Sequence, residues 1–119
     1  DVAVTGVQTC ALPILLRSVS GGIAAAGVNQ SGAVALSKDI NPVTSATANT
    51  NDGVLLPALG GMQMIILNLT NTNIKVYPSV GGQIDSLGTN IAYTLGPDAR
   101  LAFVSTSTTQ WYTMTGVYA

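Results

Sequence analysis

The chain has 119 residues, which is enough for one domain with a modest core and too few for two domains of ordinary size. Only 8% of the residues are charged and the net charge is −1, which excludes the clustered Lys and Arg of a nucleic-acid-binding surface. Such a weakly charged surface gives little repulsion between copies, so we expect an oligomer and not a free monomer.

The first segment of the chain, residues 1–14, contains a run that does not look like native protein. Val4 to Ile14 resembles the codon-by-codon translation of a common sequencing-library adapter over its whole length. We therefore expect residues 1–14 to be non-native and the natural chain to begin near Leu15; the alternative is a native strand that ends at Pro13. The only cysteine, Cys10, lies in this segment, so no intrachain disulfide can form.

Residues 15–31 are expected to form an extended N-terminal arm outside the core. Gly21–Val28 consists of small apolar residues, but its glycines disfavour a stable helix. No run in the chain reaches the roughly 20 apolar residues that a membrane-spanning helix needs, so no membrane partner is expected.

From Gly32 onward, turn residues recur about every 8–12 positions, which is typical of a β-sandwich or barrel. Asn41-Pro42 is expected to break the chain between two strands, and Asn51-Asp52-Gly53 predicts a hairpin. The expected strands are residues 33–37, 43–48, 53–56, 62–70, 74–77, 83–87, 91–95, 101–106 and 110–118.

Residues 62–70 form the strongest predicted strand. The apolar run Met64–Leu67 indicates burial on both faces and hence a central position in its sheet. Asn71-Thr72-Asn73 then predicts a second hairpin, with Ile74–Tyr77 as the returning strand. The fold class is therefore all-β: a single-domain antiparallel β-sandwich or barrel, jelly-roll-like, over residues 32–119.

The chain lacks the residues that most enzymes use. Histidine is absent, which removes the commonest general base and metal ligand, and glutamate is absent as well. Each aspartate after the first segment lies beside a turn residue, where backbone geometry alone favours Asp. Asn49–Gly53 distantly suggests a calcium loop, but it has no downstream bidentate acid. We expect no catalytic residue, no metal site and no cofactor.

The aromatic residues are the best candidates for contacts with a partner. Trp111 and Tyr112 are adjacent on a predicted strand, so they face opposite sides, and one of them should lie in the core and the other at the surface or an interface. Because aromatic side chains concentrate binding energy, the candidate interface anchors are Tyr77, Trp111, Tyr112 and Tyr118.

Several motifs in residues 32–112 follow a distinctive order. They are Gly53–Pro57, Asn68, Tyr77-Pro78, Gly81-Gly82, Asn90, Gly96, Phe103 and Ser107–Tyr112. In this order they resemble a module of small structural proteins of tailed bacteriophages. The resemblance implies a β-rich virion component and transfers no catalytic residue. Pro97–Arg100 departs from the pattern, which affects one turn only.

This resemblance leads to two expected functions. The first is a capsid decoration or cement protein on the head surface, a homotrimer by analogy, with itself and the major capsid protein as partners. The alternative is a tail fibre or baseplate module that binds a host glycan through an exposed aromatic platform around Trp111 or Tyr112. A glycan hydrolase would instead need two carboxylates about 5–10 Å apart in a cleft, and we expect no enzyme.

The adapter interpretation predicts the mass of the natural protein. If residues 1–14 are non-native, protein isolated from its source lacks their mass and yields no peptide that contains Gln8, Cys10 or Pro13. Intact mass spectrometry checks this expectation, and a mass that includes the segment contradicts it.

Overall fold

The computed structural model describes residues 17–47 and 52–115. These residues form ten strands and one short 3₁₀ helix, η1 (Gln30–Gly32). In chain order the strands are β1 (Ile23–Ala24), β2 (Val34–Ala35), β3 (Ile40–Ser45), β4 (Gly53–Leu55), β5 (Gln63–Asn68), β6 (Ile74–Tyr77), β7 (Gln83–Ile84), β8 (Tyr93–Leu95), β9 (Arg100–Ser105) and β10 (Gln110–Met114). The prediction of an all-β fold is confirmed.

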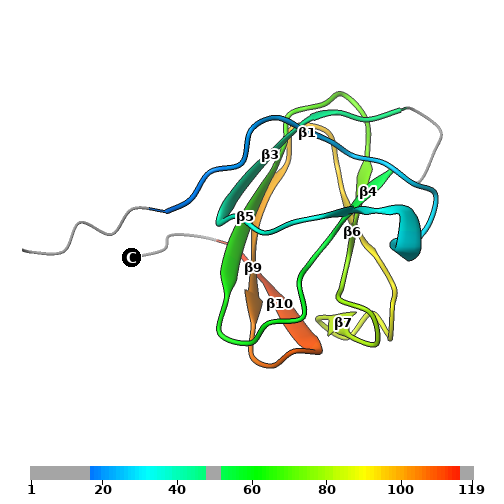
Figure 1. Ribbon diagram of the computed structural model, residues 1–119. Coiled ribbons are helices and arrows are strands. Elements are labelled where there is room, and N and C mark those ends of the chain that lie inside the picture. Colours follow the sequence, from blue (N-terminus) through cyan, green and yellow to red (C-terminus); the bar gives the residue numbers. More distant parts are fainter. Residues whose placement is uncertain (1–16, 48–51, 116–119) are drawn as a thin grey trace, which may run out of the picture.

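The chain passes back and forth between two sheets. The six-stranded sheet has the order β1-β3-β5-β9-β10-β7, and the four-stranded sheet has the order β2-β4-β6-β8. Each strand from β2 to β9 therefore lies in the sheet opposite to the strand before it. Figure 1 shows β3, β5, β9 and β10 on the left and β4 and β6 on the right. The first six strands thus follow successive turns of one coil, a winding that β-solenoids also use.

The strand directions follow from this winding. Strands that occupy the same place on successive turns run the same way, so β1–β3, β3–β5, β2–β4 and β4–β6 pair in parallel. β7–β10 is parallel as well, whereas β5–β9, β9–β10 and β6–β8 are antiparallel. The two-sheet sandwich agrees with the prediction, but the expected antiparallel arrangement is wrong because both sheets are mixed.

Both predicted hairpins are wrong for the same reason. β3 and β4, on either side of the Asn51-Asp52-Gly53 signal, lie in different sheets. β5 and β6, on either side of Asn71-Thr72-Asn73, also lie in different sheets. At both places the chain crosses the sandwich instead of returning along the sheet it came from.

Pro42 lies inside β3 and does not break the strand, contrary to the prediction. On one edge of β3, the Ile40 N–H donates to Ser18 O and Ile40 O accepts from the Ser20 N–H, both at 2.9 Å. Two residues further on, Pro42 turns its missing N–H to the same edge. The pairing of β3 with the N-terminal segment is irregular there. The missing donor therefore interrupts no regular ladder, which makes Pro tolerable.

Residues 17–31 pack on the sandwich, so the expectation of an arm over residues 15–31 is wrong for this part. β1 pairs with β3, and Ile23 and Ala25 are buried in the core. Gly22 suits this segment because a Cβ atom there would come within 2.8 Å of Thr44 Oγ1 on β3. Residues 1–16, which include the expected adapter-derived segment, lie outside the described residues.

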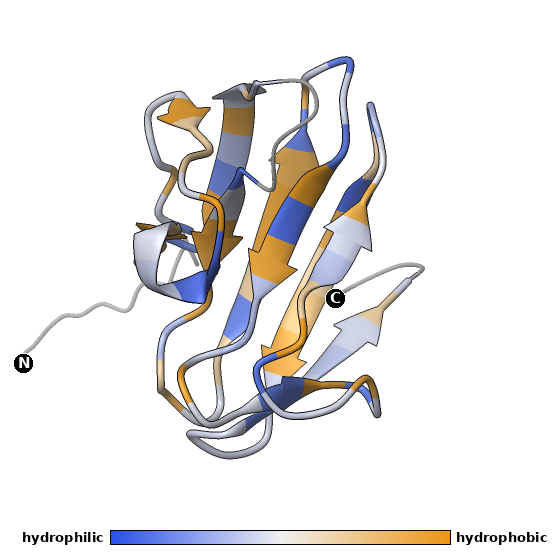
Figure 2. Ribbon diagram, turned by 90° about the vertical axis from the view of Figure 1, so that its right-hand side faces the viewer, coloured by the Kyte–Doolittle hydropathy of each residue, from blue (hydrophilic) through white to orange (hydrophobic). Residues whose placement is uncertain are grey.

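The core fills the space between the two sheets. Along β5, Met64, Ile66 and Asn68 are buried and their neighbours are not, as the period of two in a strand requires. Figure 2 shows hydrophobic and hydrophilic bands alternating along some strands, whereas Met64–Leu67 of β5 is apolar throughout. Tyr93 of the four-stranded sheet packs edge-on against Phe103 of the six-stranded sheet, with 5.9 Å between ring centroids. Other core residues are Ile23, Leu36, Val43, Val54, Leu56, Ile74, Val76, Ile84, Leu95, Leu101 and Trp111.

A buried asparagine joins the two sheets at the end of β5. The Nδ2 group of Asn68 lies within hydrogen-bond distance of three carbonyl oxygens, those of Thr72 (2.9 Å), Leu95 (3.0 Å) and Gly96 (2.8 Å). Its Oδ1 accepts from the backbone N–H and the hydroxyl of Thr70. One fully buried amide therefore fixes both the crossing from β5 to β6 and the end of β8.

Replacing Asn68 with Ala should destabilise the fold strongly. The substitution removes a fully buried amide that bonds to Thr70, Thr72, Leu95 and Gly96, which should cost about 2–4 kcal/mol of unfolding free energy. Urea unfolding followed by Trp111 fluorescence measures this loss. Asn71→Ala, at an exposed asparagine in the same crossing, is the matched control and should cost less than about 0.5 kcal/mol. Similar losses in the two variants would contradict the role assigned to Asn68.

Candidate interaction surface

The acidic side chains of the described residues do not gather into one cluster. In residues 17–47 and 52–115, no group of three His, Cys, Asp or Glu side chains could hold a metal ion. Asn49–Gly53, the run that distantly suggests a calcium loop, lies partly outside the described residues. Its Asp52 is buried and accepts a hydrogen bond from the Thr47 N–H at 2.7 Å. Within the described part of the chain, no helix has the length and apolar character to span a membrane.

Three of the motifs picked out in the sequence, Tyr77-Pro78, Gly81-Gly82 and Asn90, meet in one loop cluster. Asn90 Oδ1 accepts from the Gly81 N–H (2.7 Å) and from Gln30 Nε2 (3.1 Å), and Gln30 Nε2 also donates to Pro78 O (2.8 Å). Asn90 itself has a φ of 63°, a left-handed conformation that Asn tolerates better than most residues. These motif residues therefore hold the loops that lead into and out of β7.

Two of the four proposed interface anchors are buried. Trp111 is 0% exposed and belongs to the core, so it cannot anchor a partner on the folded protein. Tyr77 is 8% exposed and lies over Gly53, where a Cβ atom would come within 2.8 Å of its ring. These two predictions are therefore wrong, and Tyr118 lies outside the described residues. Tyr112 is 45% exposed, which confirms that Trp111 and Tyr112 divide between core and surface.

The outer face of the six-stranded sheet, on the side away from the core, is apolar. Residues paired in register point to the same side of a sheet, and one row of them crosses β3, β5, β9 and β10 together with the N-terminal segment. This row is Val19, Ile40, Ile65, Ala102 and Met114.

Further apolar residues flank this row on both sides. The pair Val104 and Tyr112 lies on one side, and the pair Pro42 and Leu67 lies on the other. The register partner of Leu67 on β9 is Arg100, an exposed cation at the margin of this surface. We call these nine residues the outer face: Val19, Ile40, Pro42, Ile65, Leu67, Ala102, Val104, Tyr112 and Met114.

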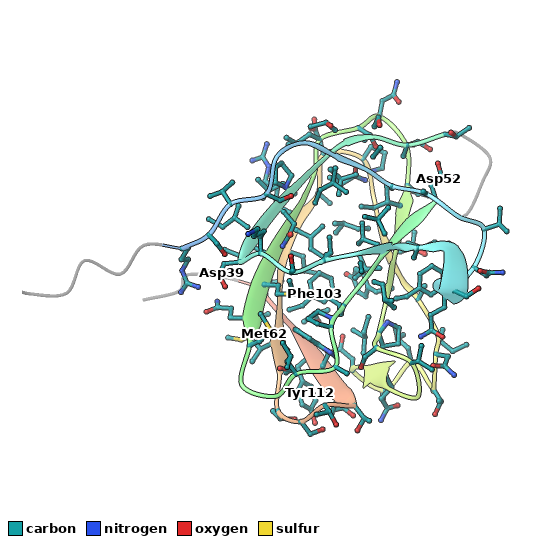
Figure 3. All side chains as sticks on the ribbon, in the orientation of Figure 1. Asp39, Asp52, Met62, Phe103 and Tyr112 are labelled. Atoms are coloured by element: carbon teal, nitrogen blue, oxygen red, sulfur yellow. The ribbon has the colours of Figure 1, made fainter. Side chains whose placement is uncertain are left out.

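The outer face is only partly covered by its own neighbours. Ala102 is 2% exposed because larger side chains surround it in register, whereas Val19 is 60% exposed. Figure 3 shows Phe103, from the inner side of β9, between the sheets and Tyr112 at the lower end of β10. A sheet with one solvated face normally carries polar residues on that face. β5 and β9 depart from this rule, which makes the outer face the best candidate for an interaction surface.

Charged residues lie at opposite ends of one row of this surface. Gln63 pairs in register with Val104, which pairs with Tyr112. At the β3 end of the row, Arg17 donates to Gln63 Oε1 at 3.4 Å. At the other end, Asp85 follows β7 beside β10. Arg17, with the Asp39 carboxylate close enough to attract it, therefore lies at one end of the row, and Asp85 lies at the other.

Asp85 also closes the free edge of β10. β7 pairs only with the first two residues of β10, and the next N–H on this edge belongs to Thr113. The Asp85 carboxylate accepts from this N–H (2.9 Å) and from the Thr113 hydroxyl (2.8 Å). A carboxylate in this position opposes the addition of another strand.

Asp39 fastens the N-terminal segment to the start of β3. Its carboxylate accepts from the backbone N–H and the hydroxyl of Ser18, at 3.0 and 3.1 Å. These two hydrogen bonds lower the pKa of Asp39 below its ordinary value of 3.8, against a small opposing effect of desolvation and with added attraction from Arg17. The ionised carboxylate therefore stabilises the folded state.

The stabilisation by Asp39 should depend on pH. Because its pKa is lower in the folded than in the unfolded state, the contribution is present above about pH 3.8 and is lost as the pH falls through the folded-state pKa. Asp39→Asn should therefore melt below the wild type at neutral pH, and the difference in Tm should shrink in acid. Thermal unfolding followed by circular dichroism checks this. A difference in Tm that stays constant with pH would contradict it.

Comparison with protein-family models, with curated proteins and with solved structures finds no match to this chain. A role for the protein therefore has to be argued from its own residues and surfaces.

Two continuous apolar runs in the sequence indicate the outer face, which the positions of the aromatic residues do not. In Met64–Leu67 and in Leu101–Val104, the residues that point to one face of the sheet and those that point to the other are all apolar. Such strands place an apolar layer on each side of the sheet, and only one of these layers can be the core of a two-sheet sandwich.

Proposed function

We propose that the chain is a structural protein of a tailed-phage virion, namely a capsid decoration protein. It would sit on the head surface as a homotrimer and brace adjacent copies of the major capsid protein. The observation that carries the proposal is the outer face, an extended apolar sheet surface on a chain with a net charge of −1. Exposed apolar patches of this kind mark protein–protein contacts. The motif resemblance supplies the virion setting.

The mechanism of such a protein is additive burial. Specific interfaces bury about 1,600 Å² each, and symmetry repeats every contact over the head lattice. Their sum opposes the outward pressure of packaged DNA without any chemical step. A rigid module suits this task, and the buried Asn68 amide supports that rigidity because it ties β5 to the end of β8.

The alternative function, glycan binding by a tail module, has less support from this surface. It needs an exposed aromatic platform with Asn and Asp beside it. Tyr112 is exposed, and Gln63 and Asp85 lie at the two ends of its row, but Trp111 is buried and cannot add a second ring to a platform. A single exposed ring gives weaker support to sugar binding than the neighbouring apolar row gives to a contact with protein.

Immunogold labelling of purified particles tests the proposed function. Antibodies raised against the chain should label many positions over the head, and the same antibodies preabsorbed with the protein should label none. Labelling confined to the tail would contradict a decoration role and support the alternative. Particles without specific label would contradict a virion function altogether.

A further inference from the structure

We infer that the outer face is the contact between copies of this chain, with the β3 end of one face against the β10 end of the next. The inference deepens the proposed function and rests on it only for the number of copies. Self-association through this face can be measured on the isolated protein, whatever particle it belongs to.

The centre of the outer face requires an apolar occupant. Ile65 and Ala102 lie at the middle of the central row, and Ile40 and Met114 continue the row on either side. Water on this row leaves apolar area exposed, and contact with an apolar partner removes that area from water. A second copy offers an apolar row of the same length and strand spacing.

The charges at the ends of the face select the orientation of the second copy. Arg17 lies at the β3 end, where it contacts Gln63, and Asp85 lies at the β10 end. Each Asp85 oxygen accepts one hydrogen bond from Thr113 and keeps further acceptor capacity. Contact between unlike ends brings Arg17 of one copy near Asp85 of the next, whereas contact between like ends opposes equal charges.

Contact between unlike ends is either isologous, with Arg17 of each copy near Asp85 of the other about a two-fold axis, or heterologous, and heterologous contacts generate closed rings when the rotation allows it. A ring of three copies, with the outer faces turned toward the axis, gives every face the same two neighbours. The homotrimer of the proposed function is therefore compatible with this contact.

Association through the edges of the six-stranded sheet is disfavoured, which favours its outer face as the contact. At one edge, the carboxylate of Asp85 occupies the Thr113 N–H that a new strand would need. At the other edge, β1 has only two residues, Ile23 and Ala24, and its register with β3 is irregular. Both edges therefore offer short templates for a further strand.

Light scattering after size exclusion tests the inference on the full chain. At about 100 µM, a range in which weak oligomers form, the wild type should have a mass at least twice the 12.1 kDa of a single chain. Ile65→Lys and Val104→Lys each place a charge in the outer face and should elute as monomers. Val80→Lys is the matched control: Val80 is 73% exposed in a loop outside the outer face and should keep the wild-type mass.

A second pair of variants tests the orientation. Arg17→Glu reverses the charge at one end and should weaken association about twofold to fivefold, the range of an exposed ion pair. Lys75→Glu reverses a charge on the four-stranded sheet and should leave association unchanged. Thermal unfolding of every variant identifies loss of folding, and only variants that unfold cooperatively are compared.

Each result bears on one claim. A monomeric wild type at this concentration, or wild-type mass in Ile65→Lys, would overturn the inference. Equal effects of Arg17→Glu and Lys75→Glu would overturn the proposed orientation. A wild-type dimer that Ile65→Lys dissociates would support the face as the contact and contradict the homotrimer. Absence of the protein from particle heads would contradict the proposed function and leave the contact between copies standing.

Discussion

The structure depends on two central strands, β5 and β9, that carry apolar side chains on both faces. Their inner side chains, among them Ile66 and Phe103, form the core with the four-stranded sheet. Their outer side chains, among them Ile65 and Val104, form a second apolar layer that stays half-buried. Strands with two apolar faces belong between two covering layers. The isolated sandwich supplies one of these layers, and the proposed contact between copies supplies the other.

The sequence predicted the strands better than their connections. Residues 62–70 contain β5, which has the predicted central place in its sheet, and the turn spacing located strands near most of the others. Turn residues specify a local change of direction, but they do not specify which sheet receives the next strand. Here that choice depends on contacts distant in sequence, such as the Asn68 amide with Leu95 O and Gly96 O. The parallel pairings could not be predicted for the same reason.

The interaction surface was only partly predictable. Adjacency on a strand correctly separated Trp111 from Tyr112, but it could not say which of them faces the core. Tyr77 has no adjacent aromatic residue with which to make the same comparison. Its burial over Gly53 follows from the pairing of β4 with β6. The outer face was missed as a unit because its residues come from the N-terminal segment, β3, β5, β9 and β10, and only the strand register brings them into one row.

We propose that the two sides of the six-stranded sheet have different roles: one side forms the core, and the other side forms the contact between copies. Hydroxyl-radical footprinting of Trp111 and Tyr112 at increasing protein concentration tests it most directly, because these neighbours report on opposite sides. The account predicts that Trp111 is protected at every concentration and that modification of Tyr112 falls as the protein associates. Equal modification of Tyr112 in dilute and associated protein would contradict the account.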